Sequence, residues 1–262
     1  MQPPAWLTHL GLAWPLAKRD VIARYRGSTL GLAWALLTPL AMVTVYALVF
    51  RGVFQARWGS SGADGLGYAL RLFAGLMAFT AVAEVASRAT RLMNDNANLV
   101  KRVVFPLELL AVALLMQVAV HSAVQMAVLA VLMLLFGEGA RWSWLLLPLA
   151  WAWLLALQFA LALLLAALGC YLRDLQHVVP VVMTGLMFLT PIFYPVEQAP
   201  KVLASVLAIN PLSAPIELLR SAWFGDSFAY AAAWPQALLV LLLLPMAAWL
   251  FARLRPGFAD LV

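Results

Sequence analysis

The sequence is poor in the residue types on which enzyme active sites and metal centres depend. Charged residues make up only 11% of its 262 residues, less than half of the roughly 25% typical of soluble domains. A single cysteine, Cys170, excludes an internal disulfide. The three histidines, His9, His121 and His177, lie in different segments, and neither a G-x-x-x-x-G-K-[ST] phosphate loop nor an H-E-x-x-H motif occurs. We therefore expect no enzyme activity, no catalytic residue, no metal and no cofactor in this chain.

Long apolar runs take the place of the missing charge, since 65% of the residues are hydrophobic. The first run, residues 30–50, carries no charge and follows directly on Arg24 and Arg26. At about 1.5 Å per residue it measures about 31 Å, the thickness of the hydrocarbon core of a bilayer. The sequence therefore predicts an all-α integral membrane protein, a single transmembrane domain over residues 1–262. Its six expected spans are residues 30–50, 68–87, 107–136, 144–168, 178–190 and 234–254.

Two segments on the inner side have patterns of their own. Residues 5–23 place apolar side chains at helical spacing, which predicts an amphipathic helix in the plane of the membrane interface. No short apolar run with a small-residue cleavage site is present there, so we expect no removable signal peptide. Residues 88–106 hold four basic residues, and Asn94, Asp95 and Asn96 are each suited to cap a short helix over residues 97–103.

The outer side is predicted to contain a pair of short helices instead of a long loop. Pro191 and Pro195 cannot continue a helix and so end the fifth span. In residues 196–230 two apolar pieces of about 7 and 13 residues flank Asn210 and Pro211. Such lengths favour re-entrant or interfacial helices between the fifth and sixth spans.

The distribution of positive charge predicts the orientation. Eleven of the 17 Lys and Arg residues fall in the expected inner segments, namely Lys18, Arg19, Arg24, Arg26, Arg88, Arg91, Lys101, Arg102, Arg173, Arg253 and Arg255. Six fall in the outer ones, namely Arg51, Arg57, Arg71, Arg141, Lys201 and Arg220. Because cytoplasmic loops are enriched in Lys and Arg, we expect both termini in the cytoplasm. These short clusters suit anionic lipid headgroups, and we expect no nucleic-acid partner.

Polar residues inside the spans allow two interpretations each. Glu84 in the second span is a candidate for proton coupling, but Arg88 lies at i+4, and we favour an ion pair between them. The third span carries a polar stripe at i, i+4 and i+8, formed by Gln117, His121 and Gln125. It contacts either the substrate or the fourth span, where Gln158 is the expected partner, and we favour helix packing. Trp142, Trp144, Trp234 and Tyr68 are expected as anchors at the outer interface.

The first span begins with a recognisable series of residues: Arg24, Tyr25, Arg26, Gly27, Ser28, Leu30, Gly31, Trp34, Pro39, Leu40, Tyr46 and Phe50. Together with NLVKRVVFPLELL at 98–110, YLRDLQHVVPVV at 171–182, FLTPIFYP at 188–195, INPLSAPIELLR at 209–220 and RLRPGFADLV at 253–262, it resembles one family, the membrane permease subunits of type-2 ABC exporters for polysaccharide. That family includes exporters of O-antigen, capsule and teichoic-acid-type polymers. The Arg-Tyr-Arg-Gly-Ser form is closer to the O-antigen exporters.

This resemblance implies a homodimer in the cytoplasmic (inner) membrane that works with two copies of a cytoplasmic ATPase. The ATPase would bind ATP and Mg, and the substrate would be a lipid-linked polysaccharide. The residues whose positions match the family are Arg24, Tyr25, Arg26 and Gly31 at an inner entrance, and Pro191, Pro195, Asn210 and Pro211 at an outer gate. The segment 88–106 resembles the coupling loop that docks on the ATPase, through Asn98, Leu99, Val100, Lys101, Arg102 and Val103. A solvated basic loop is the alternative for this segment.

Six aromatic residues lie where the resemblance is densest and are the expected lining of a polysaccharide conduit: Trp34, Tyr46, Phe50, Phe188, Phe193 and Tyr194. Aromatic faces give sugar rings an apolar contact without a fixed charge that would trap the polymer. Ordinary helix packing is the alternative for each ring.

Two other functions remain open. An exporter of drugs or small lipids would have an aliphatic cavity. An ion-coupled secondary transporter or an intramembrane enzyme would use Glu84 and His121.

Overall fold

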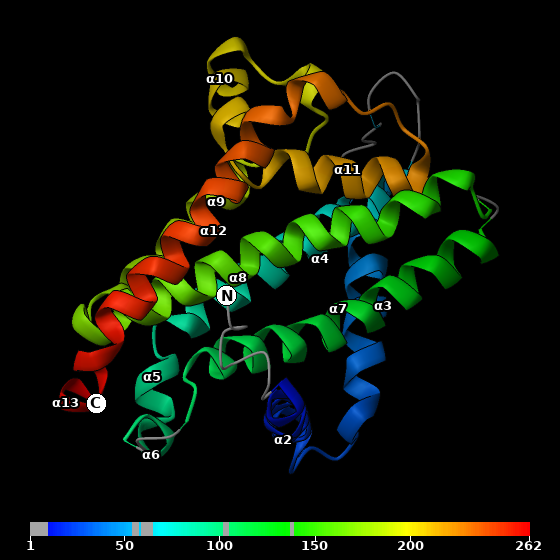
Figure 1. Ribbon diagram of the computed structural model, residues 1–262. Helices are drawn as coiled ribbons and strands as arrows, with labels where there is room; N and C mark the ends of the chain where they lie inside the picture. Colours follow the sequence, from blue (N-terminus) through cyan, green and yellow to red (C-terminus); the bar gives the residue numbers. More distant parts are fainter. Residues whose placement is uncertain (1–9, 54–57, 59–64, 102–104, 137–138) are drawn as a thin grey trace.

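The computed structural model describes residues 10–53, 58, 65–101, 105–136 and 139–262, and Figure 1 shows that it is a bundle of helices. Its longer helices are α2 (Ala13–Tyr25), α3 (Trp34–Ala47), α4 (Gly65–Ala89), α7 (Glu108–Leu135), α8 (Leu147–Tyr171), α9 (Leu175–Phe188), α10 (Lys201–Ile209), α11 (Ser213–Phe224) and α12 (Trp234–Leu254). The shorter ones are α5 (Leu92–Asp95), α6 (Ala97–Val100), α13 (Phe258–Leu261) and the 3-10 or π turns Leu10–Leu12, Gly31–Ala33, Leu48–Val53, Trp142–Leu146, Val196–Gln198, Tyr230–Ala232 and Arg255–Gly257. The all-α membrane fold is confirmed.

Five helical segments are long and apolar enough to cross a membrane: Gly31–Phe50, Gly65–Ala89, Glu108–Leu135, Trp142–Tyr171 and Trp234–Leu261. They match five of the six predicted spans. The remaining one, α9, has 14 residues. At about 1.5 Å per residue it is about 21 Å long, too short to cross the hydrocarbon core as a helix. The chain continues from it through turns and bends in residues 189–195, because prolines there prevent further helix.

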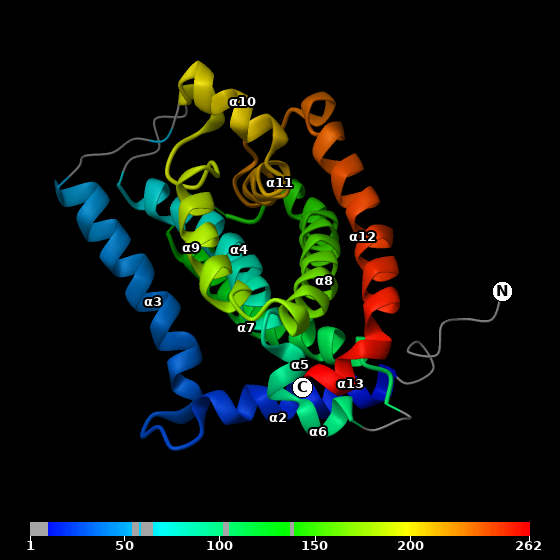
Figure 2. The ribbon, with the colours of Figure 1, turned by 90° about the vertical axis from the view of Figure 1, so that its left-hand side faces the viewer.

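Helix α4 is the centre of the bundle. In its most apolar window 83% of the residues are buried, and it packs against α7, α8, α9 and α11. Small side chains such as Ala74, Gly75 and Ala78 let these neighbours approach its backbone, which is how helices associate in lipid. On the other side of α8, α12 packs along that helix (Figure 2).

Helix α3 lies at the edge of the bundle, opposite α12 in Figure 2. Only 11% of its most apolar window is buried, although it contacts α4 and α7. Leu32 and Leu48 on this span are 65% and 68% exposed, and Val181 on α9 is 71% exposed. Apolar surfaces of this kind face either lipid or another protein chain.

Helix α2 lies crosswise to α3 at the foot of the bundle (Figure 2) and packs on α7. It buries Ala13 and Ala17, one turn apart, and exposes Trp14. A helix is therefore present from residue 13, after the 3-10 turn at Leu10–Leu12, and its amphipathic character stays a prediction. Residues 5–9 of the predicted segment lie outside the described residues. Its position in the membrane interface stays a prediction.

The two short outer helices are present as expected. Helices α10 and α11 meet at an angle of 94°, with the break at Asn210 and Pro211. The pair lies at the end of the bundle opposite α2 (Figure 1). We call these two ends outer and inner after the orientation predicted from the sequence.

Candidate functional site

Four of the six predicted conduit aromatics lie together near the outer ends of the helices. The rings of Phe188 and Phe193 stack with their centroids 5.5 Å apart, and the hydroxyl of Tyr194 donates to the carbonyl of Phe188 at 3.0 Å. Phe50 approaches the ring of Tyr68 at 4.9 Å, and the hydroxyl of Tyr68 donates to the carbonyl of Phe193 at 2.6 Å. The expectation of an interface anchor at Tyr68 is wrong, because this side chain is buried and its hydroxyl satisfies a carbonyl that has no helical partner.

The other two conduit candidates lie apart from this cluster. Trp34 begins α3 at its inner end and is 45% exposed, whereas Tyr46 packs against the core near the outer end. Twelve residues of helix separate them, a rise of about 18 Å. Within one chain four of the six rings therefore form one group, and Tyr46 and Trp34 lie apart from it and from each other.

A hydrogen-bond network around Asn210 holds together the irregular segment after α9 and the break between α10 and α11. Its amide Nδ2 donates to the carbonyl of Leu189 at 3.0 Å and to Oγ1 of Thr190 at 2.9 Å, and its Oδ1 accepts from the backbone N–H of Leu212 at 2.9 Å. Asn210, Thr190, Pro191 and Pro195 are all buried. The irregular backbone after α9 is thus enclosed by protein, as the absence of water in the membrane requires.

Gln236, which the sequence did not single out, holds the bend between α10 and α11. Its Oε1 accepts from the backbone N–H of Ala214 at 2.6 Å, and its Nε2 donates to the carbonyls of Leu207 and Ala208 at 3.0 and 3.1 Å. The side chain is buried and comes from α12, so it ties the last predicted span to the outer helices. The feature of the sequence that could have indicated this role is the position of Gln236, a single amide side chain near the start of an apolar span.

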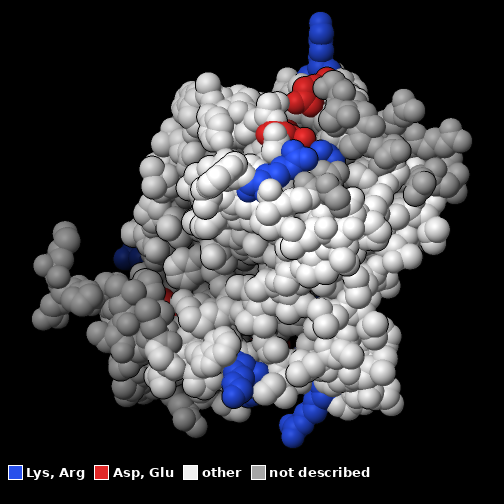
Figure 3. Space-filling model, turned by 90° about the vertical axis from the view of Figure 1, so that its right-hand side faces the viewer, with Lys and Arg blue, Asp and Glu red and all other residues white. Residues whose placement is uncertain are grey.

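Two of the six cations assigned to the outer side are buried. The guanidinium of Arg71 binds both carboxylate oxygens of Asp226, at 3.1 and 3.2 Å, and lies 4.4 Å from the ring centroid of Phe224. That of Arg220 lies 4.7 Å from the ring centroid of Trp58. Most charged side chains on the face in Figure 3 lie near its two ends, on either side of a broad uncharged band. In the described part of the chain, His, Cys, Asp and Glu form no group that could hold a metal ion.

Trp144 is half-buried and packs against α11. Its indole N–H donates to the carbonyl of Trp223 at 3.1 Å, and the two rings meet edge to face at 5.0 Å. It therefore packs the start of the fourth span against α11. Trp142 and Trp234 are 90% and 64% exposed, which agrees with the expected position at an interface.

The predicted coupling segment is helical but differs from expectation in three respects. The helix ends at Val100 and not at residue 103, and Arg102 and Val103 lie outside the described residues. The expected side-chain caps are wrong, because Asn94 and Asp95 belong to α5, and Nδ2 of Asn96 donates back to the carbonyl of Leu92. Val100 is buried, so the accessible face consists of the exposed Asn98 and Lys101 with the half-buried Leu99.

The C-terminal segment supports this coupling segment. Phe258 is fully buried between the rings of Phe251 and Tyr171, at 5.4 and 6.2 Å, and its helix α13 contacts α6. The hydroxyl of Tyr171 donates to the carbonyl of Leu254 at 3.0 Å. The sequence did not indicate this role, because a short apolar tail has no pattern of its own.

The inner-entrance residues are anchored at the base of the bundle. Nη1 of Arg24 contacts Oε1 of Glu84 at 2.8 Å, and the ring of Tyr25 stacks on His121 at 5.7 Å. Arg26 is exposed, and Gly31 adopts a positive φ of 50° in the turn that leads into α3. The predicted pair of Glu84 and Arg88 is confirmed at 3.2 Å.

The polar stripe of the third span is partly buried but not paired as expected. Gln117 and Gln158 are both buried, yet Oε1 of Gln117 and both amide atoms of Gln158 have no hydrogen-bond partner among the described residues. Instead, Nδ1 of His121 lies 2.9 Å from the carbonyl of Gln117 on its own helix, and Gln125 is half-buried. The expected polar contact between this stripe and Gln158 is therefore not formed, although both Gln117 and Gln158 are buried in helix packing.

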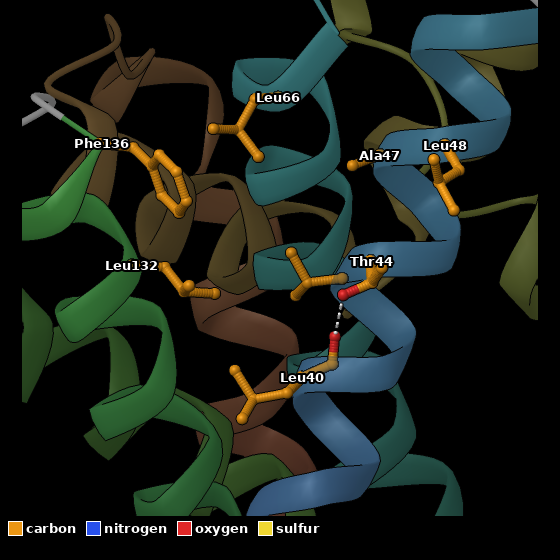
Figure 4. A pocket seen from close by; sticks show the side chains of 8 residues that line it. Leu40, Thr44, Ala47, Leu48, Leu66, Leu132 and Phe136 are labelled. Atoms are coloured by element: carbon orange, nitrogen blue, oxygen red, sulfur yellow. Dashed lines mark hydrogen bonds between the residues drawn. The ribbon is translucent and has the colours of Figure 1, made fainter.

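An apolar cavity of about 560 Å³ opens between α3, α4 and α7 (Figure 4). It is lined by Leu40, Val43, Thr44, Ala47, Leu48, Leu66, Leu132 and Phe136. The hydroxyl of Thr44 donates to the carbonyl of Leu40 at 2.8 Å, so this polar group is already satisfied. The cavity offers aliphatic contact to a hydrocarbon chain and little hydrogen bonding to a sugar.

Comparison with known proteins shows which family the chain resembles. Residues 12–224 match the ABC-2 type transporter family. The O-antigen export system permease protein RfbA of Myxococcus xanthus is 28% identical over 77% of this chain and 76% of its own length. A protein of the same name from Klebsiella pneumoniae is 23% identical over 82% and 81%, and the polysialic acid transport protein KpsM of Escherichia coli is 25% identical over 78% of each chain.

Proposed function

The chain belongs to the ABC-2 type transporter family, and from this membership we propose that it is the membrane-spanning subunit of an ATP-driven exporter of lipid-linked polysaccharide. O-antigen is the first candidate for the polymer, and the cytoplasmic (inner) membrane is the proposed location. The observation that carries this proposal is the similarity to O-antigen export permeases over more than three quarters of the chain. Capsule export, as named for the KpsM relative, is the next candidate within the same class.

The proposed partner for energy is a cytoplasmic ATPase on a separate chain, present in two copies, which binds ATP and Mg. Docking on α5 and α6 is supported by the exposed Asn98 and Lys101 beside the half-buried Leu99. A mixed face of this kind suits a short helix in a groove of the partner. The buried Val100 and Phe258 fix the helix from behind.

We propose that two copies of the chain form the conduit, with both termini of each in the cytoplasm. The support is that α3 and α9 expose large apolar side chains, and that one chain does not arrange its six candidate aromatics continuously. A closed two-fold dimer would bring a second outer cluster of Phe50, Phe188, Phe193 and Tyr194 into the assembly. Sugar rings would pass over these faces without strong binding.

Deletion of the gene, with complementation by a plasmid, tests the function. We expect the deletion strain to lose its surface polysaccharide and to accumulate lipid-linked polymer on the cytoplasmic side, and complementation to reverse both. Unchanged surface polymer, with no polymer inside, would contradict the proposal.

A second function is favoured by one observation, the aliphatic cavity between α3, α4 and α7. An exporter of drugs or small lipids would use such a cavity. The same deletion strain would then become sensitive to hydrophobic drugs, or change its lipid composition, while its surface polysaccharide stayed normal.

A further inference from the structure

The carboxylate of Glu84 joins two helices that are distant in the sequence. Its Oε1 contacts Nη1 of Arg24 at 2.8 Å and Nη1 of Arg88 at 3.2 Å. Arg88 belongs to the same helix, so that pair adds no connection between elements. Arg24 lies sixty residues away on α2, so its bond ties α2 to the inner end of α4.

On one side of Glu84 lies the segment proposed to dock on the ATPase. Arg88 is the last residue but one of α4, and α5 begins four residues later at Leu92. The connection is fixed against α8, since a Cβ on Gly169 would collide with the backbone of Thr90. Because only the turn at Thr90 and Arg91 separates α4 from α5, a displacement of α5 and α6 would act directly on the end of α4.

On the other side of Glu84 lies the segment that connects α2 to the start of α3. Helix α2 ends at Tyr25, and the chain turns through Gly27 and Gly31, both at positive φ, before α3 begins at Trp34. Because α3 has little buried surface of its own, the position of its inner end depends on this turn and on what holds the end of α2. The contacts of Arg24 with Glu84 and of Tyr25 with His121 hold the end of α2.

These ionic contacts border a polar cavity of about 520 Å³. Arg19, Asp20 and Arg24 from α2, Glu84 and Arg88 from α4, and Asp95 and Asn96 at α5 and its end contribute to its lining. The side chains of Arg24, Glu84 and Arg88 are 44%, 25% and 35% exposed, so water reaches them. Partly exposed ion pairs contribute little to stability, so we expect loss of this contact to leave folding largely unchanged.

We propose that Glu84 is a positioning residue that couples the ATPase-docking segment to the conduit helix through its bond with Arg24. This inference rests on the proposed function, and goes beyond it by assigning the path from α5 and α6, through α4 and α2, to α3. The role differs from proton coupling, because the carboxylate acts by holding Arg24 and not by carrying a proton. It predicts that loss of either partner has the same consequence.

The test uses the complete complex of permease and ATPase in the strain in which the wild-type protein restores surface polysaccharide. The variants are Glu84→Gln, Arg24→Gln, both together, Arg24→Lys and Arg88→Gln. Arg19→Gln is the matched control, since Arg19 lies on α2 and lines the same cavity but pairs with its neighbour Asp20. The measurements are membrane abundance, recovery of the ATPase, ATP hydrolysis, and polymer exported per ATP hydrolysed.

We expect Glu84→Gln and Arg24→Gln each to lower the polymer exported per ATP about fivefold, with abundance and ATPase recovery unchanged. The double variant should be no worse than either single one, because both remove the same contact. Arg24→Lys should retain most of the export, and Arg88→Gln and Arg19→Gln should have small effects.

Three results would overturn the inference: normal coupling in Glu84→Gln, multiplied losses in the double variant, or failure of Glu84→Gln to accumulate, which would assign the carboxylate to folding. Since wild-type export is established first in the same strain, any of these leaves the proposed function intact. Failure of the wild-type protein to restore polymer would instead contradict the proposed function.

Discussion

The side-chain amide of Asn210 donates a hydrogen bond of 2.9 Å to the hydroxyl of Thr190, and so joins the two helix breaks of the predicted outer gate. Thr190 follows the end of α9, and Asn210 separates α10 from α11. The same side chain satisfies the carbonyl of Leu189 and the N–H of Leu212. Because Asn210 and Thr190 are both buried, one side chain provides hydrogen-bond partners at both breaks.

Asn210→Ala should destabilise the folded protein by about 1–3 kcal/mol, because buried polar groups lose their partners. Thermal unfolding in detergent should begin at a lower temperature, and export should fall in proportion to the folded protein. Gln198→Ala is the control, since Gln198 is exposed on the neighbouring 3-10 turn. A melting temperature for Asn210→Ala equal to that of the control would contradict the proposed network.

Alanine at Tyr46, Phe193 or Tyr194 should lower surface polysaccharide about two- to tenfold at equal abundance, if these rings contact the passing polymer. Exchange of Phe for Tyr, or the reverse, should largely preserve export, because the aromatic face remains. Trp142→Ala is the control, because Trp142 is 90% exposed and makes an interface contact at most. Normal export in all three alanine variants would remove the aromatic lining from the proposal.

Gly169→Ala should lower the membrane abundance of the protein. The added Cβ would collide with the backbone of Thr90, where no flexible side chain can move aside, and such overpacking costs about 1–3 kcal/mol. Gly185→Ala is a matched control, since a Cβ at this other helical glycine meets no atom within 4 Å. Equal abundance of the two variants would show that α4 and α8 separate easily.

Lys101→Glu should reduce recovery of the ATPase with the purified permease, because it reverses a charge on the proposed docking face. Export should fall with it, while insertion stays normal. Lys201→Glu makes the same change at the start of α10, on the predicted outer side, and should leave recovery unchanged. If both variants retain the ATPase equally, the basic segment is a solvated loop.

Cysteine labelling in whole cells tests the orientation. In a background without the buried Cys170, a cysteine at Gln198 should react with an impermeant reagent and one at Asn98 should not. Both positions are exposed in the structure, so the chain itself shields neither of them from the reagent. Labelling at position 98 in intact cells would refute cytoplasmic termini.

The positions of the spans and breaks followed from the sequence because they depend on local chemistry. An apolar run of 20 or more residues is long enough to cross the bilayer wherever it packs. Pro191 and Pro195 prevent helix whatever lies beside them, and Asn210 with Pro211 separates α10 from α11. The pair of Glu84 and Arg88 was predictable for the same reason, since i and i+4 are neighbours on any helix.

The partners of the remaining polar and aromatic side chains were decided by tertiary structure. The spacing in the sequence gave no sign that Glu84 meets Arg24, that Gln236 holds the bend after α10, or that Trp144 bonds to the backbone of Trp223. These contacts depend on how each helix is rotated about its axis and on which helices become neighbours. In the long apolar helices α3, α7 and α8 hydrophobicity is nearly uniform around the helix, so the pattern of residues does not encode the rotation. The close packing of small residues around α4, and the few polar groups that must be satisfied there, set it instead.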